Sequence, residues 1–252
     1  NGNIQKEESK NLKLSLKKIN LADILPDIDS LKVAGLVSGD VFFKEKNTLL
    51  KPVGDLIVEG LKINGVNYGL MKTSIVPSNK ELGYKLKLQI ASNEIENIDA
   101  SGEITVSSSS FLESDVDLNV KLNNLKLNSL SPLGRNVLSA VRGRAKGEFK
   151  TTGKLNDFNS LGDVYLTDAG LIFPYLNTNY NFVGKTRIQL KGKTFEFHKV
   201  DLEDEIYKTK GVLKGVINYD KYNNWNLDLR VDTNNLLVMN TESKENSKYY
   251  GT

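Results

Sequence analysis

The stretch "VRGRAKGEFK", residues 141–150, alternates small or apolar residues with charged ones. Successive side chains of a β-strand point to opposite faces, so Val141, Gly143, Ala145, Gly147 and Phe149 would share one dry face. The charged residues between them would share the opposite, wet face. The pattern therefore predicts a β-strand in a sheet with one buried and one solvated face.

A related pattern precedes it by 108 residues (143 minus 35), in "AGLVSGDVFF", residues 34–43. Each copy has two glycines four residues apart, followed by an acidic residue. A membrane-helix face is excluded because charged residues lie inside the second copy. A phosphate-binding loop is excluded because neither copy ends in Gly-Lys-Ser/Thr. We therefore expect strands in which glycine replaces larger side chains on the buried face. Such positions are typical where a sheet curves tightly or where another molecule or chain segment approaches the backbone.

The same two-residue period occurs along most of the chain and favours an all-β fold. Counting the alternating runs predicts about fifteen strands, mostly connected as a meander. Short turn signals separate the runs at residues 76–82, 191–193 and 219–225, and Asn64-Gly65 is the strongest hairpin turn. The alternating apolar residues are Leu12, Leu14, Leu16, Val37, Val41, Phe43, Leu86, Leu88, Ile90, Val116, Leu118, Val120, Leu122, Phe149, Ile188, Leu190, Phe195, Phe197, Leu227, Leu229 and Val231.

Helix signals are scarce, and we expect one or two short helical inserts. Residues 131–141 are the stronger candidate, with Ser131 placed to cap and Pro132 at the first helical position. Residues 21–31 occupy the equivalent place in the first half and are interrupted by Pro26.

The repeated pattern extends beyond the paired glycines. Gly54-Asp55 and Gly162-Asp163 are also 108 residues apart (162 minus 54) and each precedes an apolar run. A repeat whose unit is a set of strands predicts a stacked, elongated architecture. We expect residues 1–252 to form one continuous segment, with a first repeat over about 11–110 and a second over about 111–252.

Composition narrows the possible functions. The chain has 252 residues, of which 39% are hydrophobic and 26% charged, and its net charge of +3 predicts no nucleic-acid partner. It has no cysteine and one histidine, His198, so thiolate chemistry and multi-histidine metal sites are excluded. We expect no enzymatic activity, no cofactor and no metal. Because the sequence begins with Asn1, we also expect it to be a fragment of a longer chain.

Several polar or aromatic residues can be interpreted either as functional residues or as ordinary structural ones. Asp201, Glu203 and Glu205 could bind calcium or act in glycoside hydrolysis, but adjacent Asp204 favours a wet turn. His198 is most simply a surface residue. For Trp225 and Tyr249-Tyr250, strand packing is favoured over ligand gripping. A basic cluster could meet lipid phosphates, although a solvated strand face is favoured, and it comprises Arg135, Arg142, Arg144, Lys146, Lys150 and Lys154.

The order of motifs in the last third resembles a known family. Gly147-Glu148-Phe149, the run 161–164, the tract 235–241 and the ending 249–252 are arranged as in TamB-like members of the AsmA-like family of Gram-negative envelope proteins. The similarity is best over residues 140–252 and looser over 11–76. It implies an elongated sheet rolled into a U-shaped trough, a β-taco, with a hydrophobic interior. It also implies an inner-membrane anchor outside this sequence, a periplasmic location, phospholipid as cargo and a TamA-like outer-membrane barrel as partner.

From the resemblance we expect a periplasmic segment whose groove conducts phospholipid between the membranes and supports outer-membrane protein assembly. The alternating apolar residues would line the groove, and Gly35, Gly39, Gly143 and Gly147 would keep it open. Two alternatives stay open. One is a chaperone-like scaffold that offers sheet edges to outer-membrane strands, and the other is a structural β-solenoid with a fully packed interior. Alternation alone does not separate a lipid lining from an ordinary core.

Overall fold

The computed structural model describes residues 12–25, 32–46, 49–92, 95–134, 139–220 and 225–241. Four short 3-10 turns interrupt the strands: η1 (Leu21–Asp23), η2 (Phe111–Glu113), η3 (Asn128–Gly134) and η4 (Pro174–Leu176). The strands are β1 (Leu12–Asn20), β2 (Val33–Lys46), β3 (Leu49–Ile63), β4 (Val66–Pro77), β5 (Gly83–Ser92), β6 (Ile95–Thr105), β7 (Asp115–Lys126), β8 (Ser139–Lys154), β9 (Asp157–Phe173), β10 (Thr178–Phe182), β11 (Thr186–Gly192), β12 (Thr194–Asp204), β13 (Lys210–Tyr219) and β14 (Trp225–Thr233).

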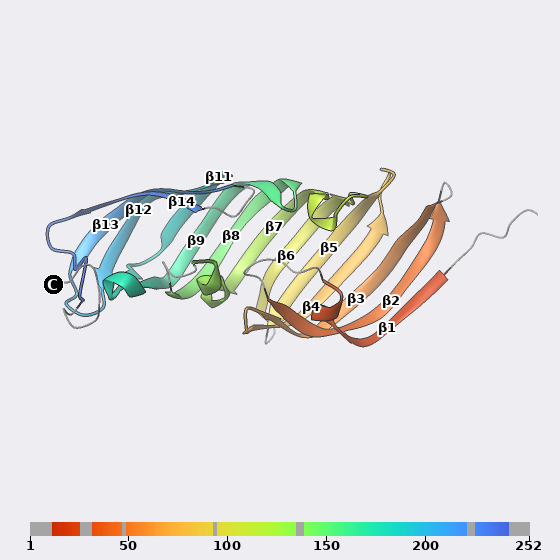
Figure 1. The fold of residues 1–252 in the computed structure, drawn as a ribbon, viewed down its shortest axis with the longest axis horizontal. Helices are drawn as coiled ribbons and strands as arrows, with labels where there is room; N and C mark the ends of the chain where they lie inside the picture. Colours follow the sequence, from red (N-terminus) through yellow and green to blue (C-terminus); the bar gives the residue numbers. More distant parts are fainter. Residues whose placement is uncertain are drawn as a thin grey trace, which may run out of the picture.

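All the strands belong to one antiparallel sheet of 14 strands, and its order follows the chain from β1 to β9. Both β10 and β11 lie between β9 and β12, so they are two pieces of one strand position, interrupted at residues 183–185. The sheet is elongated, with its strands oblique to the long axis (Figure 1). The predicted all-β class and meander are confirmed, with 14 strands where about fifteen were expected.

Local sequence explains the tight turns. Asn64 and Gly65 have φ of 49° and 80° and join β3 to β4 with Ile63 opposite Val66, which is the predicted hairpin. Gly192, with φ of 66°, begins the two-residue turn between β11 and β12. Residues 78–82 connect β4 to β5 as expected, while 221–224 lie outside the described residues.

The helical inserts are shorter than the sequence suggested. Over residues 131–141 the structure has the end of η3 and then β8, which begins at Ser139, while residues 135–138 lie outside the described residues. Ser131 does not cap a helix, because its hydroxyl accepts a hydrogen bond from the backbone N–H of Val141 at 2.9 Å. In the first half only η1 forms within the described part of 21–31, and Asn20 caps it through Ala22.

Deep burial in a single sheet requires that the sheet bend onto itself. Val58 and Val200 are 1% and 0% exposed although the described strands form a single sheet with no second sheet over it. The Tyr68 hydroxyl on β4 donates to the carbonyl of Lys126 on β7 at 2.7 Å, three strand positions away. Near the other end, the rings of Phe158 on β9 and Tyr219 on β13 lie 5.4 Å apart, also three positions away. These contacts close the sheet into a curled, U-shaped form.

Candidate functional site: the apolar face of the sheet

Two rows of residues cross the whole sheet on one face, and we name them the central row and the second row. Every neighbouring pair within a row is matched in strand register. The central row is Leu16, Gly39, Leu56, Thr73, Leu88, Ala100, Val120, Phe149, Gly162, Leu190, Phe195, Ile217 and Leu227. The second row is Val37, Val58, Met71, Ile90, Ile98, Leu122, Gly147, Val164, Ile188, Phe197, Gly215 and Leu229.

Only Thr73 interrupts this apolar surface within the two rows. Every residue that the sequence predicted as a lining residue lies in these rows or on the same face beside them, as Leu14 does opposite Val41. The structure therefore places all of them on one continuous surface from β1 to β14. Alternation predicted the face of each strand, and the strand registers join these faces into one.

The opposite face is charged. Cross-strand ion pairs join Lys13 to Asp40 at 3.0 Å, Lys121 to Glu148 at 3.0 Å and Arg187 to Asp163 at 2.8 Å. Such exposed pairs add little stability individually. They mark this side of the sheet as the one that faces water.

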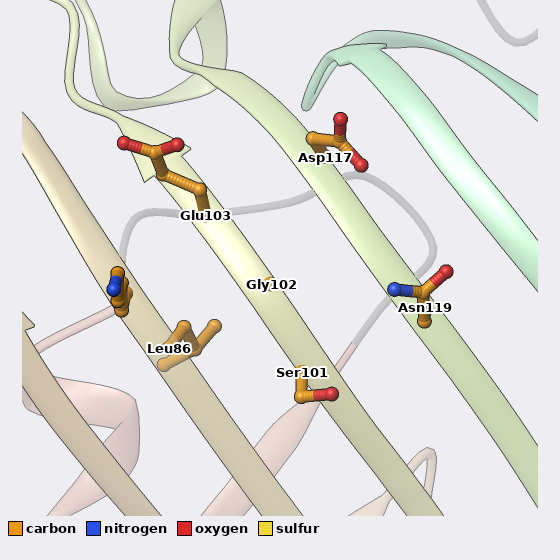
Figure 2. Close-up of a pocket in the computed structure, with 7 residues that line it drawn as sticks. Leu86, Ser101, Gly102, Glu103, Asp117 and Asn119 are labelled. Carbon is orange, nitrogen blue, oxygen red and sulfur yellow. The ribbon is translucent and has the colours of Figure 1, made fainter. Parts of the chain in front are cut away.

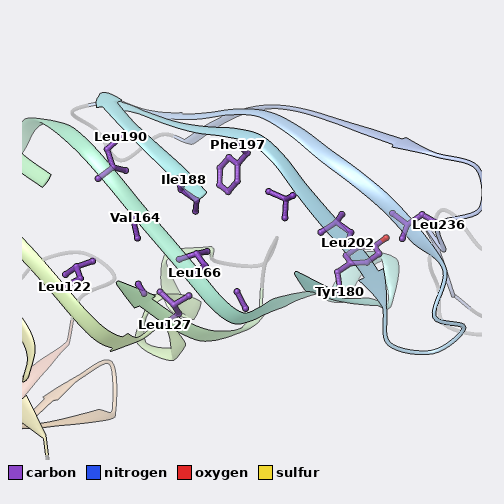
Figure 3. Close-up of a cluster of buried hydrophobic side chains, with 13 residues drawn as sticks. Leu122, Leu127, Val164, Leu166, Tyr180, Ile188, Leu190, Phe197, Leu202 and Leu236 are labelled. Carbon is purple, nitrogen blue, oxygen red and sulfur yellow. The ribbon is translucent and has the colours of Figure 1, made fainter. Parts of the chain in front are cut away.

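Exposure varies along the apolar face. Leu12 and Leu14 on β1 are 57% and 46% exposed, and Leu227 and Val231 on β14 are 43% and 40% exposed. Between these ends, the side chains of β7 to β12 form one buried cluster (Figure 3). A smaller cluster joins β2 to β5. The apolar face is therefore exposed at β1 and β14 and buried over β7 to β12, and whether it takes up lipid stays a prediction.

An aromatic contact joins the start of β9 to the end of β13 on the apolar face. The Tyr219 hydroxyl donates to the carbonyl of Phe158, and the Tyr219 ring also lies 6.1 Å from that of Phe195. Burial raises the pKa of Tyr219 to about 12, so the phenol keeps the proton that this hydrogen bond needs.

The predicted groove-opening glycines face neighbouring backbone rather than empty space. A Cβ on Gly39 would meet the carbonyl oxygen of Asp55, and one on Gly147 would meet that of Asp163. Within its row, each of these glycines lies between two larger neighbours, such as Leu122 and Val164 on either side of Gly147. The glycines thus allow adjacent strands to approach closely as the sheet bends.

The other two glycines lie beside β-bulges. A Cβ on Gly35 would lie 2.5 Å from Cγ1 of Val58, next to the register shift opposite β3. Gly143 has φ of +105°, and a Cβ there would lie 2.6 Å from the Cα of Ala169. Both positions need glycine for the local bend, and the role of keeping a passage open stays a prediction.

A segment after β14, residues 234–241, closes one rim of the sheet, and we name it the closing segment. Its Leu236 and Leu237 are buried. The Leu237 N–H donates to Thr209 Oγ1 at 2.8 Å, its carbonyl accepts from the Tyr180 hydroxyl at 2.6 Å, and the Asn240 N–H donates to the Leu176 carbonyl at 2.9 Å. The segment therefore ties β10, η4 and the turn after β12 together. Sequence reasoning missed this role, although its apolar run Leu236–Met239 was a visible signal.

The acidic residues near the end of β12, all of them described, form no group that could hold a metal ion. Asp204 is 0% exposed, so the predicted wet turn is wrong for this residue. Its carboxylate accepts hydrogen bonds from the N–H groups of Ile206, Tyr207 and Thr209 at 3.0, 2.7 and 2.6 Å and from the Thr209 hydroxyl. Asp201 and Glu203 instead form exposed pairs with Lys199 at 3.4 Å and Lys210 at 3.5 Å. Glu205 is exposed and pairs with Lys208 at 3.4 Å.

Burial alone would raise the pKa of Asp204. The hydrogen bonds from Thr209, Tyr207 and Ile206 outweigh burial and lower this pKa below its ordinary value of 3.8. Asp204 is therefore an ionised carboxylate that organises the turn between β12 and β13.

Most of the described members of the basic cluster have partners within the chain. Lys150 pairs with Asp117 at 2.8 Å and Lys154 with Glu113 at 2.5 Å, as expected for a solvated strand face. Arg142 differs, because it is half-buried and donates to the Tyr180 carbonyl at 3.0 Å, which fixes β10. Arg144 reaches the Asn124 carbonyl at 3.5 Å, and Lys146 is exposed. Arg135 lies outside the described residues.

The remaining candidates are His198, Trp225 and Tyr249-Tyr250. His198 is exposed, as predicted, and its Nε2 lies 3.1 Å from Oε1 of Gln189. The Trp225 side chain and Tyr249-Tyr250 lie outside the described residues. No group of three or more histidine, aspartate or glutamate side chains that could hold a metal occurs in the described part of the chain.

An open depression of about 440 Å³ lies around Gly102 (Figure 2). Its polar lining comes from three adjacent strands and consists of Lys85, Ser101, Glu103, Asp117 and Asn119, with Leu86 beside them. Glu103 and Asp117 already pair with Lys80 at 3.4 Å and Lys150 at 2.8 Å. The depression is thus a solvated hollow between paired charges, and the apolar face is the stronger candidate.

Comparison of the chain with protein-family models, curated proteins and solved structures gave no match. The similarity to the AsmA-like family therefore rests on the order of motifs in the sequence. Among the described residues, no helix has the length and apolar character needed to span a membrane.

Proposed function

We propose that this chain is a non-enzymatic, periplasmic segment whose apolar face shields phospholipid acyl chains between two membranes and supports outer-membrane protein assembly. The observation that carries the proposal is the pair of apolar rows, which cross the sheet from β1 or β2 to β14 in register. The resemblance to AsmA-like proteins supplies the location, the inner-membrane anchor and the TamA-like barrel partner as parts of the same proposal.

The size of the surface suits this role. Exposing an acyl chain of about sixteen carbons to water costs on the order of 12 kcal/mol, at roughly 0.8 kcal/mol per methylene. A carrier therefore needs an uninterrupted apolar surface. Thirteen strand positions at about 4.8 Å extend roughly 60 Å, several times the length of one leaflet's tails in a bilayer core of about 30 Å.

The exposure pattern indicates where a tail would first make contact. Leu12 and Leu14 offer accessible apolar surface on β1, whereas the face between β7 and β13 is closed by its own side chains. In this proposal a tail binds first at the β1 end, and further passage requires the packed walls to separate.

Replacing both exposed leucines tests this contact. Leu12→Gln/Leu14→Gln should weaken phospholipid binding about ten-fold, because two apolar contacts are lost at little cost in stability. Native mass spectrometry, after incubation with vesicles of phosphatidylethanolamine and phosphatidylglycerol, measures the bound lipid. Lys17→Gln is the matched control, since Lys17 is also an exposed residue of β1 but is not apolar. Absence of lipid on the unmodified chain, or an equal loss with Lys17→Gln, would contradict the proposal.

A second candidate is a scaffold for outer-membrane strands, and the free edge of β1 favours it. Within the described residues, β1 pairs only with β2. An incoming strand could add to this edge by β-augmentation. Photocrosslinking from β1 to an unfolded outer-membrane protein, without lipid bound to the apolar face, would support this function over the first.

A further inference from the structure

The edge strand β14 has the sequence symmetry of a self-pairing surface. It runs from Trp225 to Thr233, so its middle residue is Leu229. On its outer face, Asp228 and Arg230 flank this centre. On its apolar face, Leu227 and Val231 flank the same centre and are 43% and 40% exposed. Two opposite charges thus lie at equal distances on either side of Leu229, and so do two apolar side chains.

The two charges of β14 differ in their surroundings, and Asp232, the ion-pair partner of Arg230, also pairs with Lys214 at 3.5 Å. Arg230, with an 81% exposed side chain, lies opposite Lys214 of β13, a residue of like charge. Asp232 on its own strand is its ion-pair partner, at 2.7 Å. Asp228 lies opposite Val216 and makes no ion pair with any residue that the structure describes. A cation beside Asp228 would give it an ion pair, and Arg230 of a second copy, 81% exposed, could supply it.

We propose that β14 pairs antiparallel with β14 of a second copy of this chain, about a two-fold axis through Leu229. In this register Asp228 lies opposite the partner's Arg230, and Leu227 lies opposite the partner's Val231. A two-fold axis through Asp228 or Arg230 would instead place like charges opposite each other. An axis between two neighbouring residues would place apolar residues opposite charged ones. The Leu229 register also pairs the whole strand.

The other edge of the sheet does not share this property. The charged residues of β1 are Lys13, Lys17 and Lys18, all of one sign. Two β1 edges brought together would repel each other, which is a common protection of edge strands. A two-fold dimer is therefore specific to β14. It would extend both apolar rows into the second copy without a break.

One strand pair buries less than the roughly 1,200 Å² typical of stable complexes, so the dimer should be weak and reversible. Sedimentation velocity over about 5–200 µM measures it. Asp228→Arg and Arg230→Asp should each weaken dimerisation about ten-fold, because each replaces two attractions by two repulsions. An equimolar mixture of the two variants should dimerise again, since the paired charges are then opposite. A monomeric unmodified chain, or a mixture no better than either variant alone, would overturn the proposal.

Cysteine crosslinking tests the register independently, because the chain contains no cysteine. Opposite residues of an antiparallel pair have Cα atoms about 4.5–5.5 Å apart, within disulfide range. Leu229→Cys should therefore form a disulfide dimer under mild oxidation, whereas Leu14→Cys on β1 should stay monomeric. Equal crosslinking at both positions, or crosslinking at position 14 alone, would refute pairing through β14. Neither readout depends on lipid binding, so failure here leaves the proposed function to its own test.

Discussion

Replacing Asp204 by alanine is expected to lower the free energy of unfolding by about 4 kcal/mol. The carboxylate is 0% exposed and accepts hydrogen bonds from three backbone N–H groups and the Thr209 hydroxyl. Removing it leaves these donors without their acceptor. Urea unfolding followed by circular dichroism measures the loss.

The loss should extend to the closing segment. Thr209 Oγ1, held by Asp204, also accepts the N–H of Leu237 at 2.8 Å. Hydrogen exchange over residues 234–241 should therefore become faster in Asp204→Ala. Asp201→Ala is the matched control on the same strand, because Asp201 forms only an exposed pair with Lys199 at 3.4 Å, and it should change stability by less than about 0.5 kcal/mol.

The contribution of Asp204 to the stability of the fold should decrease as the pH falls. The pKa of Asp204 is lower in the folded chain than its ordinary value of 3.8, so ionisation stabilises the fold above that value. This contribution is lost as the pH falls through the lowered pKa. The stability difference between the unmodified chain and Asp204→Asn should therefore be full at neutral pH and shrink below about pH 4. A difference that stays constant down to pH 2 would show that the charge of Asp204 does not stabilise the turn.

The fold class could be predicted from the sequence because its signals are local. Alternation assigns each strand a dry face without reference to any other strand, and Asn64-Gly65 specifies a hairpin by its backbone preferences alone. The residues of β8, from Val141 to Phe149, are assigned correctly for this reason. Strand order then follows from the short connections between antiparallel neighbours.

The curling of the sheet depends on distant contacts and could not be predicted in the same way. Tyr68 reaches Lys126, 58 residues away, and Tyr219 reaches Phe158, 61 residues away. No local pattern specifies such pairs. Asp204 was misassigned for a related reason, because an acidic residue at a strand end is usually exposed to solvent. Its burial depends on the hydrogen-bond donors that the following turn supplies.

Gly147→Ala is expected to lower the free energy of unfolding by about 3 kcal/mol, an unusually large cost for one methyl group. Gly147 lies in the second row between Leu122 and Val164, and it is not among the glycines with positive φ. Its conformation therefore suits alanine, and the cost arises from contact alone. The new Cβ would meet the carbonyl oxygen of Asp163 and lie 2.8 Å from the Cα of Val164. Backbone cannot yield without moving β8 away from β9, so the bend of the sheet must relax.

Gly184→Ala separates this contact effect from backbone strain. Gly184 has φ of +72°, and no atom lies within 4 Å of the position that a Cβ would take, so alanine there should cost only about 1 kcal/mol. Urea unfolding of both variants gives the comparison, and hydrogen exchange should show loosening along β8 and β9 for Gly147→Ala only. If Gly147→Ala were as mild as Gly184→Ala, the close approach of β8 and β9 would not depend on glycine. The curvature would then have to come from the β-bulges, such as those opposite Gly35 and beside Gly143.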